Sequence, residues 1–189
     1  LRKNPDMLGK TVYVLPLGSH DLGFPSACAA GVLGGNGSLV SDQTTAACAG
    51  LCPAGFTCGT EATVAPAACR TGHYCPKGTS VAIPCKAGSY SGSASLTKPD
   101  QCIPTDRGHS APTGSTKQTA CAPGTVAPNA SMGACDACKS TDRRYQPSSG
   151  KSECMDCGAG NYSSNDLSCE PCQVGEYCEM AQRFAKRCP

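Results

Sequence analysis

Large apolar side chains are sparse along this chain, and over most of its length they do not follow the spacing of an amphipathic helix. They occur mainly as single cysteines and single aromatic residues, separated by short runs of Gly, Ala, Ser, Thr and Pro. Such a pattern predicts short extended segments joined by tight turns. Two stretches differ: Lys10–Leu17 predicts one β-strand that ends at a proline, and Glu179–Lys186 predicts one or two helical turns.

One short motif recurs: a cysteine, two residues, a glycine, one residue and then an aromatic residue. The glycine permits a positive φ in a turn that a side chain would obstruct. The aromatic ring can lie over a neighbouring disulfide and supply most of the apolar area that so small a repeat buries. The copies begin at Cys52, Cys69, Cys85, Cys121 (without the aromatic), Cys157 and Cys172, with a Tyr-then-Gly variant between Cys138 and Cys154. Because such repeats contact only their neighbours, we expect an elongated ladder or rod of short β-ribbons.

Composition decides what stabilises these ribbons. Leu, Ile, Val and Phe make up only 23 of 189 residues, and Trp is absent. A chain below roughly 20% in these residues is normally too poor in apolar side chains to bury a core. The 17 cysteines reverse that expectation, because about 9% cysteine is typical of domains built on disulfides. The predicted fold class is therefore a set of small disulfide-rich repeats with little helix and no large hydrophobic core.

The cysteine pairing can be argued but is not determined by sequence alone. A scheme that pairs cysteines in chain order leaves only Cys188 alone, with a partner expected beyond Pro189. Shifting the scheme by one cysteine would create three Cys-x-x-Cys bridges, a geometry more typical of redox centres than of scaffolds. In the first group, pairing of Cys52 with Cys69 and of Cys58 with Cys75 stays open. The sequential pairs are Cys28–Cys48, Cys52–Cys58, Cys69–Cys75, Cys85–Cys102, Cys121–Cys135, Cys138–Cys154, Cys157–Cys169 and Cys172–Cys178.

The cysteine pattern also divides the chain into four segments. Residues 1–27 have no cysteine and are expected to be the end of a preceding segment with one strand. Residues 28–51 form a Gly/Ala/Ser-rich loop closed by a disulfide. Residues 52–120 hold the first group of repeats. Residues 121–189 hold the second group, which is truncated at the C-terminus.

Disulfides at this density indicate an extracellular or secretory compartment. Three acceptor sequons, at Asn36, Asn129 and Asn161, predict N-glycosylation and agree with that compartment. A net charge of +2 with no basic patch argues against nucleic-acid binding. No apolar run is long enough to cross a membrane, and with neither a leader nor an initiator Met we expect a mature product or a fragment.

Four cysteines raise the alternative of a zinc site. Cys135, Cys138, Cys154 and Cys157 have the spacing of a four-cysteine zinc ribbon. The same Cys-x-x-Cys spacing recurs at Cys169 within a ladder whose cysteines nearly all need partners, so disulfides are the favoured interpretation. Redox catalysis is disfavoured too, because Cys154-Met-Asp-Cys157 places an acid between the thiols and no helix pattern follows.

Other catalytic or metal-binding arrangements find no support in the sequence. The three histidines, His20, His73 and His109, lie in different loops and build no triad with Ser and Asp. The loop aspartates do not form the dense acidic loop that calcium needs. We therefore expect no enzymatic activity, no metal and no cofactor.

From Cys52 to Cys188, and most specifically from Cys121 onward, the chain resembles the ephrin-receptor-like cysteine-rich repeat. That repeat is a relative of the TNF-receptor and laminin-type ladders. The motif is clearest in Cys157-x-x-Gly160-x-Tyr162 and in Cys172-x-x-Gly175-x-Tyr177, whereas the region before Cys52 departs from it. The resemblance implies extracellular, non-catalytic tandem modules, found in receptor ectodomains and in long secreted proteins of protists and algae. The small filling residues are similar to those of the shaft glycoproteins of algal flagellar hairs (mastigonemes).

Two functions follow from this interpretation. The first is an extracellular structural glycoprotein, a segment of a disulfide-laddered rod that assembles into a filament, appendage or wall on a cell surface or flagellum. Its partners would be copies of itself or other filament and matrix glycoproteins. The alternative is a receptor ectodomain or adhesin stalk built of cysteine-rich ligand-binding modules. That alternative predicts a transmembrane helix beyond Pro189.

Overall fold

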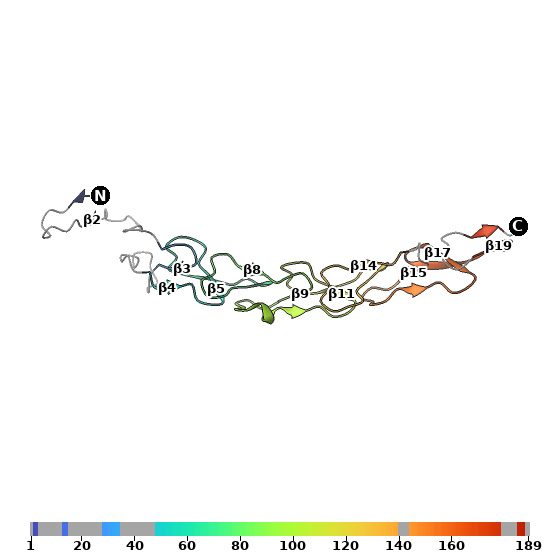
Figure 1. The fold of residues 1–189 in the computed structure, drawn as a ribbon, viewed down its shortest axis with the longest axis horizontal. Helices are drawn as coiled ribbons and strands as arrows, with labels where there is room; N and C mark the ends of the chain where they lie inside the picture. The colour runs from blue at the N-terminus through green and yellow to red at the C-terminus, as the bar shows by residue number, and fades with distance from the viewer. Residues whose placement is uncertain are drawn as a thin grey trace. The chain divides into compact units, whose positions relative to one another are not determined.

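The computed structural model describes residues 2–3, 13–14, 28–34, 48–139, 144–178 and 185–187. Within these residues the fold is a series of two-stranded ribbons, with one 3₁₀ turn, η2 (Pro99–Gln101), as its helical element (Figure 1). Consecutive strands pair into ten two-stranded sheets. This confirms the predicted class of small disulfide-rich β-ribbon repeats with little helix.

Almost every strand is two residues long, because each ribbon lies between two tight turns. The exceptions are β17 and β18, whose pairing has a register shift between Ser163 and Asn165. The sheets are β1 (Arg2–Lys3) with β2 (Tyr13–Val14), β3 (Val32–Leu33) with β4 (Gly50–Leu51), β5 (Phe56–Thr57) with β6 (Ala67–Ala68), β7 (His73–Tyr74) with β8 (Ile83–Pro84), β9 (Ser89–Tyr90) with β10 (Ile103–Pro104), β11 (His109–Ser110) with β12 (Thr119–Ala120), β13 (Thr125–Val126) with β14 (Asp136–Ala137), β15 (Arg144–Tyr145) with β16 (Met155–Asp156), β17 (Asn161–Asn165) with β18 (Ser168–Pro171), and β19 (Glu176–Tyr177) with β20 (Lys186–Arg187).

The two ends of the chain differ from expectation. The strand predicted within Lys10–Leu17 is present at Tyr13–Val14, and it pairs with a further strand at Arg2–Lys3. The helix predicted over Glu179–Lys186 falls mostly outside the described residues. Where the structure does describe it, Lys186 lies in strand β20 and pairs with Tyr177, so the helix prediction is wrong at that residue.

Eight disulfides link the described cysteines in chain order, which is the sequential scheme. The crossed alternative is not adopted, because Cys52 bonds Cys58 and Cys69 bonds Cys75. Cys188 lies outside the described residues. The chain forms two compact units, one of Leu1–Arg70, Tyr74–Ile83 and Ser95–Lys98, and one of Thr71–His73, Pro84–Ala94 and Pro99–Pro189.

A glycine with a positive φ, here called the frame glycine, recurs in the repeats, and six of these glycines start a backbone hydrogen bond to the following repeat. From Gly31 to Gly108, the N–H donates to the carbonyl of the residue three positions after the next frame glycine, whereas Gly124 donates to Gln146 in the repeat that starts at Cys138. In the first unit Gly55 donates to Cys75 at 2.8 Å, and in the second unit Gly108 donates to Ala127 at 2.9 Å. The frame glycines that bond in this way are Gly31, Gly55, Gly72, Gly88, Gly108 and Gly124, with φ between 73° and 90°.

Further hydrogen bonds tie the first residue of each repeat to both sides. The N–H of Cys121 donates to the frame glycine of the preceding repeat, Gly108, at 2.9 Å. The carbonyl of Cys121 accepts from Gly150 at 2.8 Å, and Gly150 also has a positive φ, of 70°. Within each unit, neighbouring repeats are therefore joined by a ladder of main-chain hydrogen bonds.

Except in the repeat that starts at Cys172, where both cysteines are half-buried, two positions in each repeat are buried, and most of them are filled by cysteines or small residues. The first is the start of the motif, at Cys28, Cys52, Cys69, Cys85, Thr105, Cys121, Cys138 and Cys157. The second lies three residues after the frame glycine, at Cys58, Cys75, Ser91, Ala111, Ala127 and Ser163 and, in the repeat that starts at Cys138, at Gln146. The tyrosines one position before this second site are only half-buried. The core is thus a column of disulfides and small side chains.

The repeat pattern begins earlier than the sequence suggested. Gly31 has a φ of 90°, its N–H donates to Cys58 at 2.8 Å, and its carbonyl accepts from Cys52 at 2.9 Å. Residues from Cys28 onward therefore form a repeat of the same geometry. The resemblance in sequence starts at Cys52, whereas the backbone geometry of the repeat starts at Cys28.

Candidate functional site

The repeats are closed by disulfides of two kinds, and the difference lies in what fills the second buried position. In short-loop repeats, which start at Cys52, Cys69 and Cys172, both positions are cysteines and bond each other across a sequence separation of 6. These cysteines are buried in the first two repeats and half-buried in the third. In wide-loop repeats the first cysteine bonds a cysteine that lies three residues before the next repeat. The wide-loop bridges of this spacing are Cys85–Cys102, Cys121–Cys135, Cys138–Cys154 and Cys157–Cys169, with separations of 12 to 17.

The wide-loop repeats satisfy their second buried position locally. Ser91 Oγ accepts from the N–H of Ser93 at 3.1 Å, and Ser163 Oγ donates to the carbonyl of Asn165 at 2.6 Å. Gln146 donates its Nε2 to the carbonyl of Glu153 at 2.8 Å. Each polar side chain buried in this column therefore has a partner, as buried polar groups require.

One repeat has no cysteine and was missed by the sequence reasoning. It starts at Thr105, has its frame glycine at Gly108, and places Ala111 at the second buried position. Thr105 is 1% exposed and Ala111 is fully buried. The N–H of Thr105 donates to Gly88 at 3.0 Å, as Cys85 and Cys121 donate to the frame glycines Gly72 and Gly108. The available signal was Gly108 itself, spaced from Gly88 and Gly124 like the other frame glycines.

Hydrogen bonds close the Thr105 repeat where others have a covalent bond. Thr105 Oγ1 accepts from the N–H of Met132 at 3.0 Å. Gln118 lies three residues before Cys121, the place of the closing cysteine in a wide-loop repeat. Its Oε1 accepts from the N–H of Asp106 at 2.8 Å, and its Nε2 donates to Asp106 Oδ2 at 2.7 Å. A two-bond clasp between Asp106 and Gln118 thus replaces the disulfide.

Arg107 adds an attachment to the two repeats that follow. Its Nε donates to the carbonyl of Pro128 at 2.9 Å. Its Nη2 lies 3.3 Å from Glu153 Oε1, and these two side chains are 59% and 79% exposed. Exposed ion pairs of this kind contribute little to stability, so the hydrogen bond to Pro128 and the main-chain ladder carry most of the attachment.

The predicted glycosylation sites lie in different surroundings. Asn36 is outside the described residues. Asn129 is exposed in the turn after β13, and its sequon residue Ser131 uses its backbone N–H to bond Thr105 at 2.9 Å. Asn161 is half-buried at the start of β17 and donates its Nδ2 to the carbonyl of Ala159 at 3.4 Å. Asn129 is therefore the more accessible of the two described acceptors.

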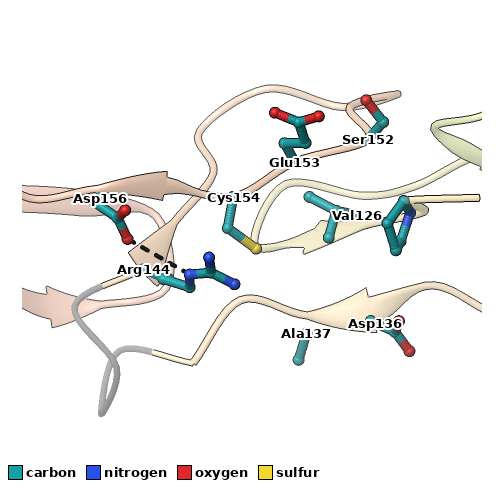
Figure 2. A pocket seen from close by; sticks show the side chains of 9 residues that line it. Val126, Asp136, Ala137, Arg144, Ser152, Glu153, Cys154 and Asp156 are labelled. Carbon is teal, nitrogen blue, oxygen red and sulfur yellow. Dashed lines mark ion pairs between the residues drawn. The ribbon is translucent and has the colours of Figure 1, made fainter.

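An open hollow of about 430 Å³ lies in the second unit beside the ion pair of Arg144 and Asp156, whose Nε and Oδ1 are 3.5 Å apart. Figure 2 shows Arg144 and Asp156 facing each other, with Glu153 and Ser152 on the loop that precedes Cys154. The hollow is lined by Val126, Pro128, Asp136, Ala137, Arg144, Ser152, Glu153, Cys154 and Asp156. The side chains of Arg144 and Asp156 are 54% and 72% exposed, so their charges are largely screened by solvent.

The four cysteines with zinc-ribbon spacing are held in disulfides. Cys135 bonds Cys121, Cys138 bonds Cys154, and Cys157 bonds Cys169. Because a metal binds the thiolate form, cysteines in these bonds are not available as ligands. Across the part of the chain that the structure describes, no group of three or more His, Cys, Asp or Glu is arranged to hold a metal ion.

The remaining candidate groups make local contacts within their turns. His73 and His109 each follow a frame glycine, and their Nδ1 atoms lie 3.0 Å and 3.3 Å from the carbonyls of Thr71 and Arg107. His20 lies outside the described residues. Tyr162 donates its hydroxyl to Glu170 Oε2 at 2.9 Å. That hydrogen bond, with smaller contributions from desolvation and from the charges of Glu170 and Glu176, raises the pKa of Tyr162.

No family model matches the chain, and no curated protein matches it either. Eight disulfides identify a cysteine-rich protein of the extracellular type. No helix among the described residues has the length and hydrophobicity needed to span a membrane. The functional argument therefore depends on the ladder itself.

Proposed function

We propose that this chain is a load-bearing segment of an extracellular structural glycoprotein, with a mechanical rather than a catalytic role. The observation that carries the proposal is the ladder that joins each frame glycine to the next repeat. Gly88, for example, donates to Ala111 at 2.8 Å, and the N–H of Thr105 donates back to Gly88 at 3.0 Å. A structure whose neighbouring repeats are joined at every step suits the transmission of tension.

The composition supports the same role. A repeat that buries only disulfides and small side chains keeps its form without a hydrophobic core, because cross-links restrict the unfolded chain. Short ribbons between disulfides also leave few long, unconstrained segments for a protease. Together these properties favour a component that stays intact outside the cell.

We extend the proposal to assembly and location. The ladder would form part of a rod that joins copies of itself, or other filament and matrix glycoproteins, in a filament, appendage or wall. The resemblance to ephrin-receptor-like repeats and to mastigoneme shaft glycoproteins supports a cell-surface or flagellar appendage. A glycan on the exposed Asn129 would keep one side of such a rod solvated.

Electron microscopy of the material isolated from its native source, without reduction, tests this proposal. An antibody raised against this chain would identify the particles. We expect labelled filaments or sheets with a fixed axial repeat. Labelled single rods attached to membranes would contradict assembly and would favour the receptor-ectodomain or adhesin alternative.

A further inference from the structure

The disulfides divide the chain between Cys28 and Cys178 into closed loops and free connectors. Under tension, force passes through each disulfide and stretches only the connectors. The connectors at 136–137, 155–156 and 170–171 have two residues each. The connector at 103–120, between Cys102 and Cys121, has 18 residues and is the longest in this range.

The two next-longest connectors are better anchored than this one. Residues 59–68 and 76–84 are connectors of ten and nine residues that follow short-loop disulfides. In those repeats both buried positions are cysteines bonded to each other, so only the second turn is free to open. In the Thr105 repeat neither Thr105 nor Ala111 is covalently anchored. The whole repeat can therefore unfold while every disulfide stays closed.

The contacts that hold residues 103–120 are non-covalent, and the side chains of Asp106 and Arg107 that make some of them are solvent-exposed. Strands β11 and β12 pair over only two residues each. The clasp joins an exposed Asp106 to a half-buried Gln118, and Arg107 reaches Glu153 through an exposed ion pair. Further hydrogen bonds involve the backbone of Thr105, Gly108, Ala111 and Gly114, the Thr105 hydroxyl with the N–H of Met132, and Arg107 Nε with the carbonyl of Pro128. Polar contacts open to water give way more readily than a covalent bridge.

We propose that residues 103–120 form a built-in extension segment that opens first under tension, while the flanking loops 85–102 and 121–135 stay closed. This inference rests on the proposed load-bearing role. The chain from Cys102 to Cys121 reaches roughly 65 Å when fully extended. Opening therefore lengthens the molecule by less than that amount. The segment can refold when tension is released, because the disulfides on either side preserve its anchor points.

Single-molecule pulling of the non-reduced, full 189-residue chain tests this inference directly. We expect the first unfolding event to release less than roughly 65 Å of contour. The double variant Thr105→Cys with Gln118→Cys places cysteines at the two positions that form the bridge in wide-loop repeats. In this variant we expect the first event to be lost. The matched control, Thr105→Ser with Gln118→Ser, has side chains of similar size that cannot cross-link, and should keep the event at lower force.

Limited trypsin digestion of the wild-type chain gives a second test that needs no variant. Arg107 and Lys117 lie in the extension segment, and Lys77 is an equally exposed site in the connector 76–84. We expect cleavage after Arg107 or Lys117 to be at least tenfold faster than after Lys77, measured on reduced gels. Equal rates, or an unchanged first event in the cross-linked variant, would overturn the inference.

The two proposals fail in different ways. Filaments in the electron microscope together with a late-opening segment 103–120 would overturn the extension segment alone. Early opening of the segment in a chain that forms no assembly would overturn the filament role alone.

Discussion

The Thr105 repeat and the Cys121 repeat that follows it solve the same structural problem in two ways. Their frame glycines, Gly108 and Gly124, have φ values of 81° and 82°, and both donate to the next repeat, at 2.9 Å and 2.7 Å. One repeat is closed by the Cys121–Cys135 disulfide and the other by hydrogen bonds from Asp106 and Gln118. The frame glycine and the main-chain ladder therefore define the repeat, and the disulfide determines how firmly it is closed.

Reducing all the disulfides removes the difference between the two repeats. Of the changes considered, it should destabilise the fold most. Each disulfide contributes roughly 2–4 kcal/mol, and eight of them together exceed the roughly 5–15 kcal/mol of a typical folded domain. We expect the reduced and alkylated protein to lose its protected amides and to expand. Amide hydrogen exchange and small-angle scattering measure this, with the oxidised protein as control. Retained protection after complete alkylation would show that the ladder alone specifies the fold.

Removing one bridge sharpens the comparison. The double variant Cys121→Ala with Cys135→Ala should lower the free energy of unfolding by about 3 kcal/mol, because the bridge closes a loop of about 15 residues. Urea denaturation of the full chain measures the loss. Local hydrogen exchange should then show the Cys121 repeat opening as readily as the Thr105 repeat. A loss below about 1 kcal/mol would mean that the ladder bonds, rather than the bridge, hold the Cys121 repeat.

The two frame glycines themselves provide a matched pair of substitutions. Gly108→Ala and Gly124→Ala impose the same positive-φ strain on alanine, about 1–2 kcal/mol. At Gly108 the new methyl group would also collide with the backbone carbonyl of Gly150, which cannot move without breaking the ladder. At Gly124 its nearest neighbour is the flexible end of Leu167, at 3.3 Å.

We therefore expect Gly108→Ala to be the more destabilising variant by about 2 kcal/mol, since overpacking against rigid atoms costs about 1–3 kcal/mol. Thermal or urea unfolding of both variants measures the difference. Gly160→Ala is a control, because its new methyl group would have no atom within 4 Å while φ is 78°. Similar losses at Gly108 and Gly124 would show that strain, rather than close approach of the repeats, explains the glycines.

The sequence predicted the ribbons and the sequential disulfides because cysteine spacing and glycine turns are local features. It did not reveal the Thr105 repeat, because the search used cysteine as the mark of a repeat while the geometry depends on Gly108. The repeat that starts at Cys28 was also missed, although its glycine Gly31 bonds Cys58 in the same way. The clasp between Asp106 and Gln118 could not be predicted from the sequence either. These residues are 12 positions apart, and their contact can be inferred only when the register of strands β11 and β12 is known.

That clasp gives the smallest predicted effect and the most direct measure of what replaced the disulfide. Asp106→Ala and Gln118→Ala should each cost about 0.5–1.5 kcal/mol, the net value of hydrogen bonds made near water. Their double variant should reveal a coupling energy of about 0.5–1 kcal/mol, because the two side chains bond each other. A double-mutant cycle on Arg107 and Glu153 should give a smaller coupling energy, since that ion pair is exposed. If the Asp106–Gln118 coupling were zero, Thr105 and the main-chain ladder would alone close this repeat, and its opening would not depend on the position where other repeats place a cysteine.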